Sequence, residues 1–292
     1  MTDSSEVSTT VIDTINTIFK NLFSSIDTEL YDILDDLTFI SSDILDDKYF
    51  GKIFGTSAAS GILLIANSLL VGFVLYFAIK YLTANFTYSR IENPIQFIFK
   101  LIIFGICMNC SYFIIEQALD INSNISLIIR SIGEDLFDQD ICFANLIDCI
   151  NENLEITEDS LDVFSVDGLI KGTTTISLLN LVITYALRYV MVKIFVLLSP
   201  FAILSLCLEN AAWFFKLWYR NLFSLLFVQI IVSLVLLILF SIDYTDNDLM
   251  IKFIYLGGIY ALIRANSFVR EFMIGAGISV NAGGSTLNLT TK

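Results

Sequence analysis

The sequence predicts an all-α, polytopic membrane protein, and two observations carry this prediction. Hydrophobic residues make up 56% of the 292-residue chain and the mean hydropathy is +0.76, whereas soluble domains average about 45–50% apolar residues. These residues are gathered in blocks of roughly twenty, the length that a helix needs to cross a bilayer. The sequence contains five such blocks, and we therefore expect about five transmembrane helices.

Composition excludes several functions. The net charge of −14 argues against nucleic-acid binding through the overall field and against a peripheral anchor on anionic lipid. The chain has no histidine, which removes the commonest general base, metal ligand and haem ligand. Nucleotide-binding and hydrolase motifs are also absent from the sequence. We therefore expect a protein that is not an enzyme and that uses no cofactor or metal.

Residues 1–50 form an acidic region with eleven acids and two lysines. Apolar residues recur within it at steps of three and four, the pattern of an amphipathic helix with room for one break. These apolar positions are Val11, Ile15, Ile18, Leu22, Ile26, Leu30, Ile33, Leu37 and Ile40. Because the polar face is acidic, the helix suits a partner protein or the protein's own bundle better than a lipid surface.

Residues 51–115 hold the first and second predicted spans. The first runs from about Ile53 to Leu82 and is cleanly apolar only in its later part. The second runs from about Ile95 to Ile115 and follows Asn93–Pro94, a turn and a helix start. We expect each span to be one helix.

Residues 116–171 form a long acidic loop with thirteen acids and two bases. Apolar pairs within it predict a small, folded, helical excursion. It contains Cys142 and Cys149, and a disulfide between them would be possible outside the cytoplasm. On one helix the two would lie about 10 Å apart, too far for a bridge. A disulfide would therefore need a turn between them, and both alternatives stay open.

Residues 172–274 hold the third, fourth and fifth predicted spans, at Ile176–Leu198, Asn221–Ile242 and Met250–Phe268. The fifth span is the weakest of the five, because it is short and flanked by lysine and arginine. Residues 275–292 are rich in Gly, Ser and Asn, which predicts a flexible cytoplasmic tail.

The apolar run from Ile176 to Leu208 is too long for one crossing. As a single helix it would be about 50 Å long, against a hydrocarbon core of about 30 Å. We expect the third span to end at Pro200 in a proline elbow at the cytoplasmic face. An aromatic and basic segment, Glu209–Arg220, follows and is typical of a membrane interface. The candidate residues for a subunit contact or a pathway-lining elbow are Arg188, Ser199, Pro200, Phe201, Trp213 and Trp218.

Arg188 is the costliest residue of the predicted spans, because a base near mid-span costs roughly 2.5–3.5 kcal/mol on insertion scales. Two interpretations stay open. Its side chain snorkels to the cytoplasmic interface, as we expect for Lys193, or it has a functional or inter-helix role. The predicted spans contain no Asp or Glu to pair with it. This absence also argues against an ion-coupled transporter, which needs such a carboxylate.

The distribution of basic residues predicts an orientation. Five spans put the two termini on opposite sides of the membrane. Ten of the sixteen Lys and Arg residues then lie on one side and six on the other, and the richer side is expected in the cytoplasm. We expect an extracytoplasmic N-terminus and loop, a cytoplasmic C-terminus, and a location in the cytoplasmic (inner) membrane.

Several stretches between Leu197 and Phe272 support a resemblance. They are Leu198-Ser199-Pro200-Phe201-Ala202, then Trp218 and Gln229, and then Ala261-Leu262-Ile263-Arg264-Ala265-Asn266 with Phe268-Val269-Arg270-Glu271-Phe272. Together with the layout of the spans, they resemble the TrbL/VirB-type polytopic inner-membrane subunit of conjugative type IV secretion systems. The layout covers nearly the whole chain.

The resemblance implies a structural subunit that is not an enzyme. It implies assembly in the lipid bilayer with other membrane subunits, with the secretion ATPases and, as one option, with further copies of itself. It also implies indirect or transient contact with a translocating DNA–protein substrate. The alternative is a stand-alone membrane channel or transporter. The missing carboxylate and the absence of obvious inverted repeats weigh against that alternative.

Overall fold

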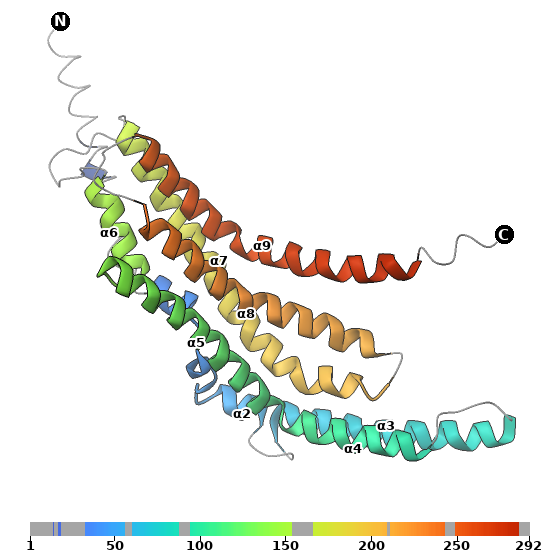
Figure 1. The fold of residues 1–292 in the computed structure, drawn as a ribbon. Helices are drawn as coiled ribbons and strands as arrows, with labels where there is room; N and C mark the ends of the chain where they lie inside the picture. Colours follow the sequence, from blue (N-terminus) through green and yellow to red (C-terminus); the bar gives the residue numbers. More distant parts are fainter. Residues whose placement is uncertain are drawn as a thin grey trace, which may run out of the picture. The chain divides into compact units, whose positions relative to one another are not determined.

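The computed structural model describes residues 14, 17–18, 33–55, 60–87, 94–153, 166–208, 211–242 and 249–285. Regular structure in these residues is helical throughout, with no strand among them, which confirms the all-α prediction (Figure 1). The elements are η1 (Ser42–Leu45), α2 (Phe50–Phe54), α3 (Gly61–Thr87), α4 (Pro94–Asn109), α5 (Ser111–Phe137), α6 (Phe143–Asn153), α7 (Val166–Ser205), α8 (Ala212–Phe240) and α9 (Leu249–Ser285).

Three helices are long and apolar enough to cross a membrane by length and composition. They are Gly61–Ala84 within α3, Gly168–Ser205 within α7, and α8. A fourth is added when α4 and α5 are taken together as one bent span. The protein is thus a helical, polytopic membrane protein, with three or four candidate spans in the described residues. The predicted fifth span lies in α9, which is not among these candidates and whose mean hydropathy is lowered by Lys252 and Arg264.

The second predicted span is not one straight helix. α4 ends at Asn109, and α5 begins at Ser111 after a bend of 58°. The Asn109 amide donates to the Gly105 carbonyl oxygen at 2.8 Å and exchanges hydrogen bonds with Asn67 of α3. Local bonds of this kind compete with the helical ladder. These hydrogen bonds are made by polar side chains, and the apolar pattern used to predict the span does not reveal them.

Much of the acidic segment 116–171 is helical, as predicted. α5 carries the chain to Phe137, α6 follows at Phe143, and α7 already begins at Val166. The third predicted span is accordingly the later part of a much longer helix. Residues 154–165 lie outside the described residues.

The later part of the N-terminal region packs into the protein's own bundle. Residues 33–38 are helical, and η1 and α2 follow, so the expected amphipathic helix is broken there. Its apolar side chains are buried, among them Leu34, Ile40 and Phe50. The predicted helical residues 1–13, 15–16 and 19–32 lie outside the described part of the chain.

The chain forms two compact units, and the first comprises Met1–Phe39, Ser123–Tyr189 and Phe227–Lys292. Its core consists of buried helical stripes, such as Val228, Val232 and Leu236 on α8. A stripe on α9 with spacings of three and four faces the same core and comprises Tyr255, Ile259, Leu262, Ala265 and Val269. These spacings place each stripe on one face of its helix.

The second unit comprises Ile40–Asn122 and Val190–Leu226. In it, α3 and α4 form a hairpin (Figure 1). The rings of Phe77 and Phe97 stack between these two helices with centroids 3.7 Å apart. A small core connects the hairpin with the end of α7 and contains Ala66, Met108, Ile203, Leu204 and Cys207. Other large apolar side chains of the hairpin, such as Leu75, are exposed, as suits a lipid-facing helix.

An ion pair in the second unit joins two residues for which the sequence predicts opposite sides of the membrane. Lys193 Nζ lies 3.5 Å from an Asp47 carboxylate oxygen and 5.7 Å from the centre of the Phe50 ring. The predicted topology puts Lys193 on the cytoplasmic side and Asp47 in the extracytoplasmic region. The segment around Asp47 therefore packs beside α7 at the level of Lys193.

Candidate functional site

Arg188 lies in the interior of the first unit and is only 1% exposed. Its Nη1 donates to the Thr38 carbonyl oxygen at 2.8 Å, and its Nη2 lies 3.4 Å from Gln229 Oε1. The side chain therefore has an inter-helix role and does not snorkel away from the bundle. Both acceptors are neutral, in agreement with the absence of a carboxylate from the predicted spans.

The Thr38 carbonyl belongs to the last residue of the helical segment 33–38. Carbonyl groups in the last turn of a helix have no partner within the helix, and they form the negative end of its dipole. The Arg188 guanidinium thus caps this segment with a positive charge. The Thr38 hydroxyl donates to the Leu34 carbonyl at 2.6 Å, which ties the same turn together.

A network of neutral polar groups continues from Gln229 across the first unit. The Ser233 hydroxyl donates to the Gln229 carbonyl at 3.1 Å and lies 2.5 Å from the Ser126 hydroxyl. On the neighbouring face of α7, the Tyr185 hydroxyl donates to the Leu262 carbonyl at 3.2 Å. These hydrogen bonds connect α5 with α8 and α7 with α9, and buried polar contacts of this kind favour one arrangement of a bundle.

Pro200 lies inside α7, which continues to Ser205. The expected end of the third span near Leu198, and the break at Pro200, are therefore wrong. Proline has no N–H, so it leaves the carbonyl four residues earlier, that of Val196, without its helical donor. The Ser199 hydroxyl donates to this carbonyl at 2.7 Å. Serine side chains and neighbouring helices make proline tolerable inside membrane helices in this way.

Trp218 of α8 satisfies the adjacent carbonyl of α7. Its indole Nε1 donates to the Phe195 carbonyl oxygen at 2.8 Å, and the side chain is buried. Phe201 packs against the small core of the second unit. Ser199, Pro200 and Trp218 thus form one cluster around the proline, which we call the proline junction.

Trp213 does not join the proline junction. Its side chain is 64% exposed and contacts the Phe214 ring edge-on. An exposed tryptophan at the start of α8 fits the interfacial role that the sequence suggests. Arg188 belongs to the first unit and the proline junction to the second, so the predicted residues form two sites.

Among the described residues, no group of three or more His, Cys, Asp or Glu side chains could hold a metal ion. Cys142 and Cys149 are free thiols, and α6 begins at Phe143 without a turn that could bring them together. Burial raises the pKa of the Cys142 thiol, which lowers its reactivity at neutral pH.

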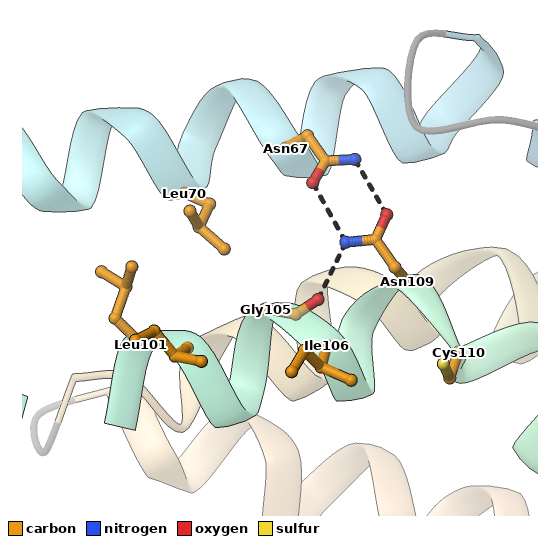
Figure 2. A pocket seen from close by; sticks show the side chains of 8 residues that line it. Asn67, Leu70, Leu101, Gly105, Ile106, Asn109 and Cys110 are labelled. Atoms are coloured by element: carbon orange, nitrogen blue, oxygen red, sulfur yellow. Dashed lines mark hydrogen bonds between the residues drawn. The ribbon is translucent and has the colours of Figure 1, made fainter. Parts of the chain in front are cut away.

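A shallow groove on the α3–α4 hairpin is a third feature, which no sequence pattern predicted. Figure 2 shows the reciprocal pair of Asn67 and Asn109 amides above it, joined at 3.2 and 3.3 Å. The groove has a volume of about 400 Å³. The rest of its lining is mostly apolar: Leu70, Leu101, Ile102, Gly105, Ile106 and Cys110. The amide pair holds the two helices of the hairpin together.

The partners of the predicted residues are what sequence reasoning missed. Gln229 stood out only through the resemblance, and Thr38 did not stand out at all. A signal for Arg188 was present, because it continues the buried stripe of Leu181 and Tyr185 at steps of four and three. No family model and no curated protein matches this sequence.

Proposed function

We propose that this protein is a membrane-embedded structural subunit of a conjugative type IV secretion machine, which helps translocate a DNA–protein substrate across the cytoplasmic membrane. One observation carries the proposal: residues on which the resemblance rests are residues that join helices. Trp218 bonds α8 to α7, and Gln229 of α8 accepts a hydrogen bond from Arg188 of α7. Such residues serve a scaffold, which a structural subunit requires.

The partners in this proposal are other membrane subunits and the secretion ATPases. The acidic segment 116–171, with thirteen acids and two bases, is unsuited to gripping DNA phosphates directly. It contacts a protein partner, and the DNA–protein substrate is touched indirectly or transiently. The exposed apolar side chains of the α3–α4 hairpin face lipid or another subunit.

The proposed location is the cytoplasmic membrane, with the N-terminus outside and the C-terminus in the cytoplasm. Residues 40–55 then re-enter the membrane region beside α7, because Asp47 pairs with Lys193. Irregular backbone is tolerated at that depth where protein covers it. The burial of Ile40, Ile44 and Leu45 meets this condition.

A transfer assay tests the function. Deletion of the gene from a conjugation-competent host should abolish conjugative transfer, and the wild-type gene should restore it. Trp218→Phe keeps an aromatic ring but removes the N–H that bonds the Phe195 carbonyl, so we expect reduced restoration at equal protein level. Trp213→Phe is the matched control, because Trp213 is exposed, and should restore transfer fully.

The stand-alone channel or transporter makes the opposite prediction. Transfer would survive deletion of the gene, and the purified protein in liposomes would conduct ions or move a solute. A gene for a VirB-type ATPase or a coupling protein beside this one would favour the secretion role.

Labelling of single cysteines tests the orientation. In a cysteine-free background, Glu152→Cys should react with an impermeant reagent from outside, and Lys216→Cys only after the membrane is permeabilised. Labelling of both from the same side would overturn the proposed orientation.

A further inference from the structure

Residues 33–39 form a short segment that lies across three elements of the first unit, and we call it the strap. Its side chains are well packed: Leu34 is 1% exposed and Thr38 is fully buried. Phe39 packs against the core of the unit, and its ring centroid lies 6.4 Å from that of Phe143. More than eighty residues separate the strap from the next described helix of its own unit. Contacts with its neighbours in space therefore hold the strap in place, and the short contacts below are the ones that do so.

The first contact is a cap supplied by Asp35. Its carboxylate oxygens accept hydrogen bonds from the Phe143 N–H at 3.2 and 3.3 Å. Phe143 begins α6, a helix of eleven residues, whose first N–H groups have no partner within the helix. A carboxylate is favoured at this positive end of the dipole. Here the cap comes from a part of the chain far away in sequence.

The second contact is made by Arg130 of α5. Its Nε donates to the Ile141 carbonyl oxygen at 2.7 Å, and its guanidinium lies 4.4 Å from the centre of the Phe39 ring. One side chain therefore links α5, the start of α6 and the end of the strap. A cation over an aromatic face is attracted by the negative charge of the ring face.

The strap also covers Arg188. The acceptor at 2.8 Å from Arg188 Nη1 is the Thr38 carbonyl, so the guanidinium loses this partner when the strap leaves. From these contacts we infer that residues 33–39 are a releasable strap that seals Arg188. Arg130 and the acceptor oxygens of Asp35 hold the strap closed, whereas the negative charge on Asp35 favours its opening. This inference is independent of the proposed role in secretion.

The protonation state of Asp35 affects the stability of the closed strap. Burial raises the pKa of Asp35 to about 6 from its ordinary value of 3.8, against the hydrogen bonds from the Phe143 and Ala144 N–H groups and the charge of Arg130. Asp36 on the strap raises it slightly. Further titratable groups close to this junction are Asp140 and Cys142, in the segment before α6, and Glu134 of α5, which interacts with Asp140 and Arg130.

The sign of the pH effect follows from this shift. The protonated form of Asp35 is favoured more in the closed state than in the open, exposed state. Closure is therefore strongest at low pH and weakens as the pH rises toward and through 6. With an open-state pKa of 3.8 and a closed-state pKa of about 6, the opening equilibrium should rise about tenfold from pH 5 to pH 7.

Hydrogen exchange of the full-length protein in nanodiscs tests the strap. After correction for intrinsic exchange rates, peptides covering 33–39 should exchange faster than α6 and up to about tenfold faster at pH 7 than at pH 5. Asp35→Asn keeps an acceptor oxygen without the charge, so it should slow exchange at pH 7 and remove the pH dependence. Asp36→Asn removes the same charge one residue along and should change both much less, because Asp36 contributes only slightly to the pKa of Asp35.

Two outcomes overturn the inference. In one, residues 33–39 exchange only together with the core of the unit, which means that no strap opens. In the other, Asp35→Asn and Asp36→Asn behave alike, which means that Asp35 does not control it.

Chemical modification gives a second readout at Arg188 itself. Phenylglyoxal should modify Arg188 slowly in the wild type, and severalfold faster in Leu34→Ala, which removes packing from the strap. Arg264 is exposed and serves as the internal reference, with an unchanged rate in both proteins. Suppose that hydrogen exchange shows the strap opening faster in Leu34→Ala than in the wild type. If phenylglyoxal then modified Arg188 at the same rate in both proteins, the strap would not seal Arg188.

Discussion

At the scale of single residues, Arg188 shows how neutral acceptors help a bundle to accommodate a buried guanidinium. Its guanidinium is bonded to a helix-terminal carbonyl and to an amide oxygen. Both carry partial negative charge, and both are held by elements that are themselves packed. A carboxylate partner would have added a second ion to desolvate, at several kcal/mol. Neutral acceptors avoid that cost.

Replacement of Arg188 should destabilise the first unit. Arg188→Met keeps the length and packing of the side chain but leaves the Thr38 carbonyl without this donor. An unsatisfied buried acceptor costs about 1–3 kcal/mol, and we expect the free energy of unfolding in detergent to fall by that amount. Lys193→Met is the control, because its ion pair with the half-exposed Asp47 should contribute less than about 1 kcal/mol. Equal losses in the two variants would contradict this account.

The sequence allowed the environment of Arg188 to be predicted only in part. Its place on a helical stripe could be predicted, because the sequence has a run of residues at steps of three and four: Leu181, Tyr185, Arg188, Val192 and Val196. All five are buried in the structure. Its main partner, Thr38, lies 150 positions away in the sequence. The partner is moreover a main-chain carbonyl, and every residue has one. No side-chain pattern could have singled it out.

At the scale of elements, α7 shows why a proline does not have to end a membrane helix. The hydropathy and the excess length of the run predicted a break at Pro200. In the structure the Ser199 hydroxyl and the Trp218 indole satisfy the carbonyls of Val196 and Phe195. The neighbouring Ser199 is visible in the sequence, but the contact with Trp218 depends on tertiary packing. The break between α4 and α5 also escaped prediction, and Asn109 beside it bonds to Asn67 of another helix.

Substitution of Pro200 tests how the proline affects the stability of the protein. Pro200→Ala restores an N–H that can bond to the Val196 carbonyl, and alanine is favoured over proline inside a helix by about 3 kcal/mol in model systems. We expect the melting temperature of the protein to stay the same or to rise. A clear fall in melting temperature would mean that the proline ring itself stabilises the packing of the proline junction.

Adjacent glycines on α9 give a matched pair for the packing of this element. A Cβ added to Gly258 would lie 2.4 Å from a methyl carbon of Leu239, whereas a Cβ on Gly257 would meet nothing within 4 Å. Gly258→Ala should therefore cost about 1–3 kcal/mol through overpacking. Gly257→Ala should be neutral or stabilising by up to about 1 kcal/mol, the difference in helix propensity. Chemical unfolding that ranks the two in the opposite order would contradict the packing of α9 on α8.

At the scale of the whole molecule, the number of crossings decides the side on which the chain ends. All-α architecture and several spans follow from composition and hydropathy alone, and both are confirmed. The number of spans does not follow from them. α7 is longer than one crossing, α4 and α5 are joined at a bend, and α9 is only weakly apolar. Length and composition support three or four spans in the described residues, against the five expected.

We predict that α9 crosses the membrane. The helix has 37 residues, about 55 Å of length, which exceeds the roughly 30 Å hydrocarbon core. Its second base, Arg264, donates to the Tyr260 hydroxyl at 3.1 Å and lies 5.5 Å from the centre of that ring. The hydrogen bond satisfies one donor of the Arg264 guanidinium. Its partner is a tyrosine, a residue type that is enriched at membrane interfaces. The cost of carrying Arg264 through or near the bilayer is lowered accordingly.

Labelling of the C-terminal end distinguishes the two cases. In a cysteine-free background, Thr290→Cys should be accessible from the same side as Lys216→Cys and from the side opposite to Glu152→Cys. If α9 lay along the surface, Thr290→Cys would instead react together with Glu152→Cys, because one crossing would be missing. Each single-cysteine protein also carries its own control, since reaction after solubilisation in detergent measures the total reactive thiol. An odd number of crossings between Glu152 and Thr290 requires α9 as a span together with α7 and α8.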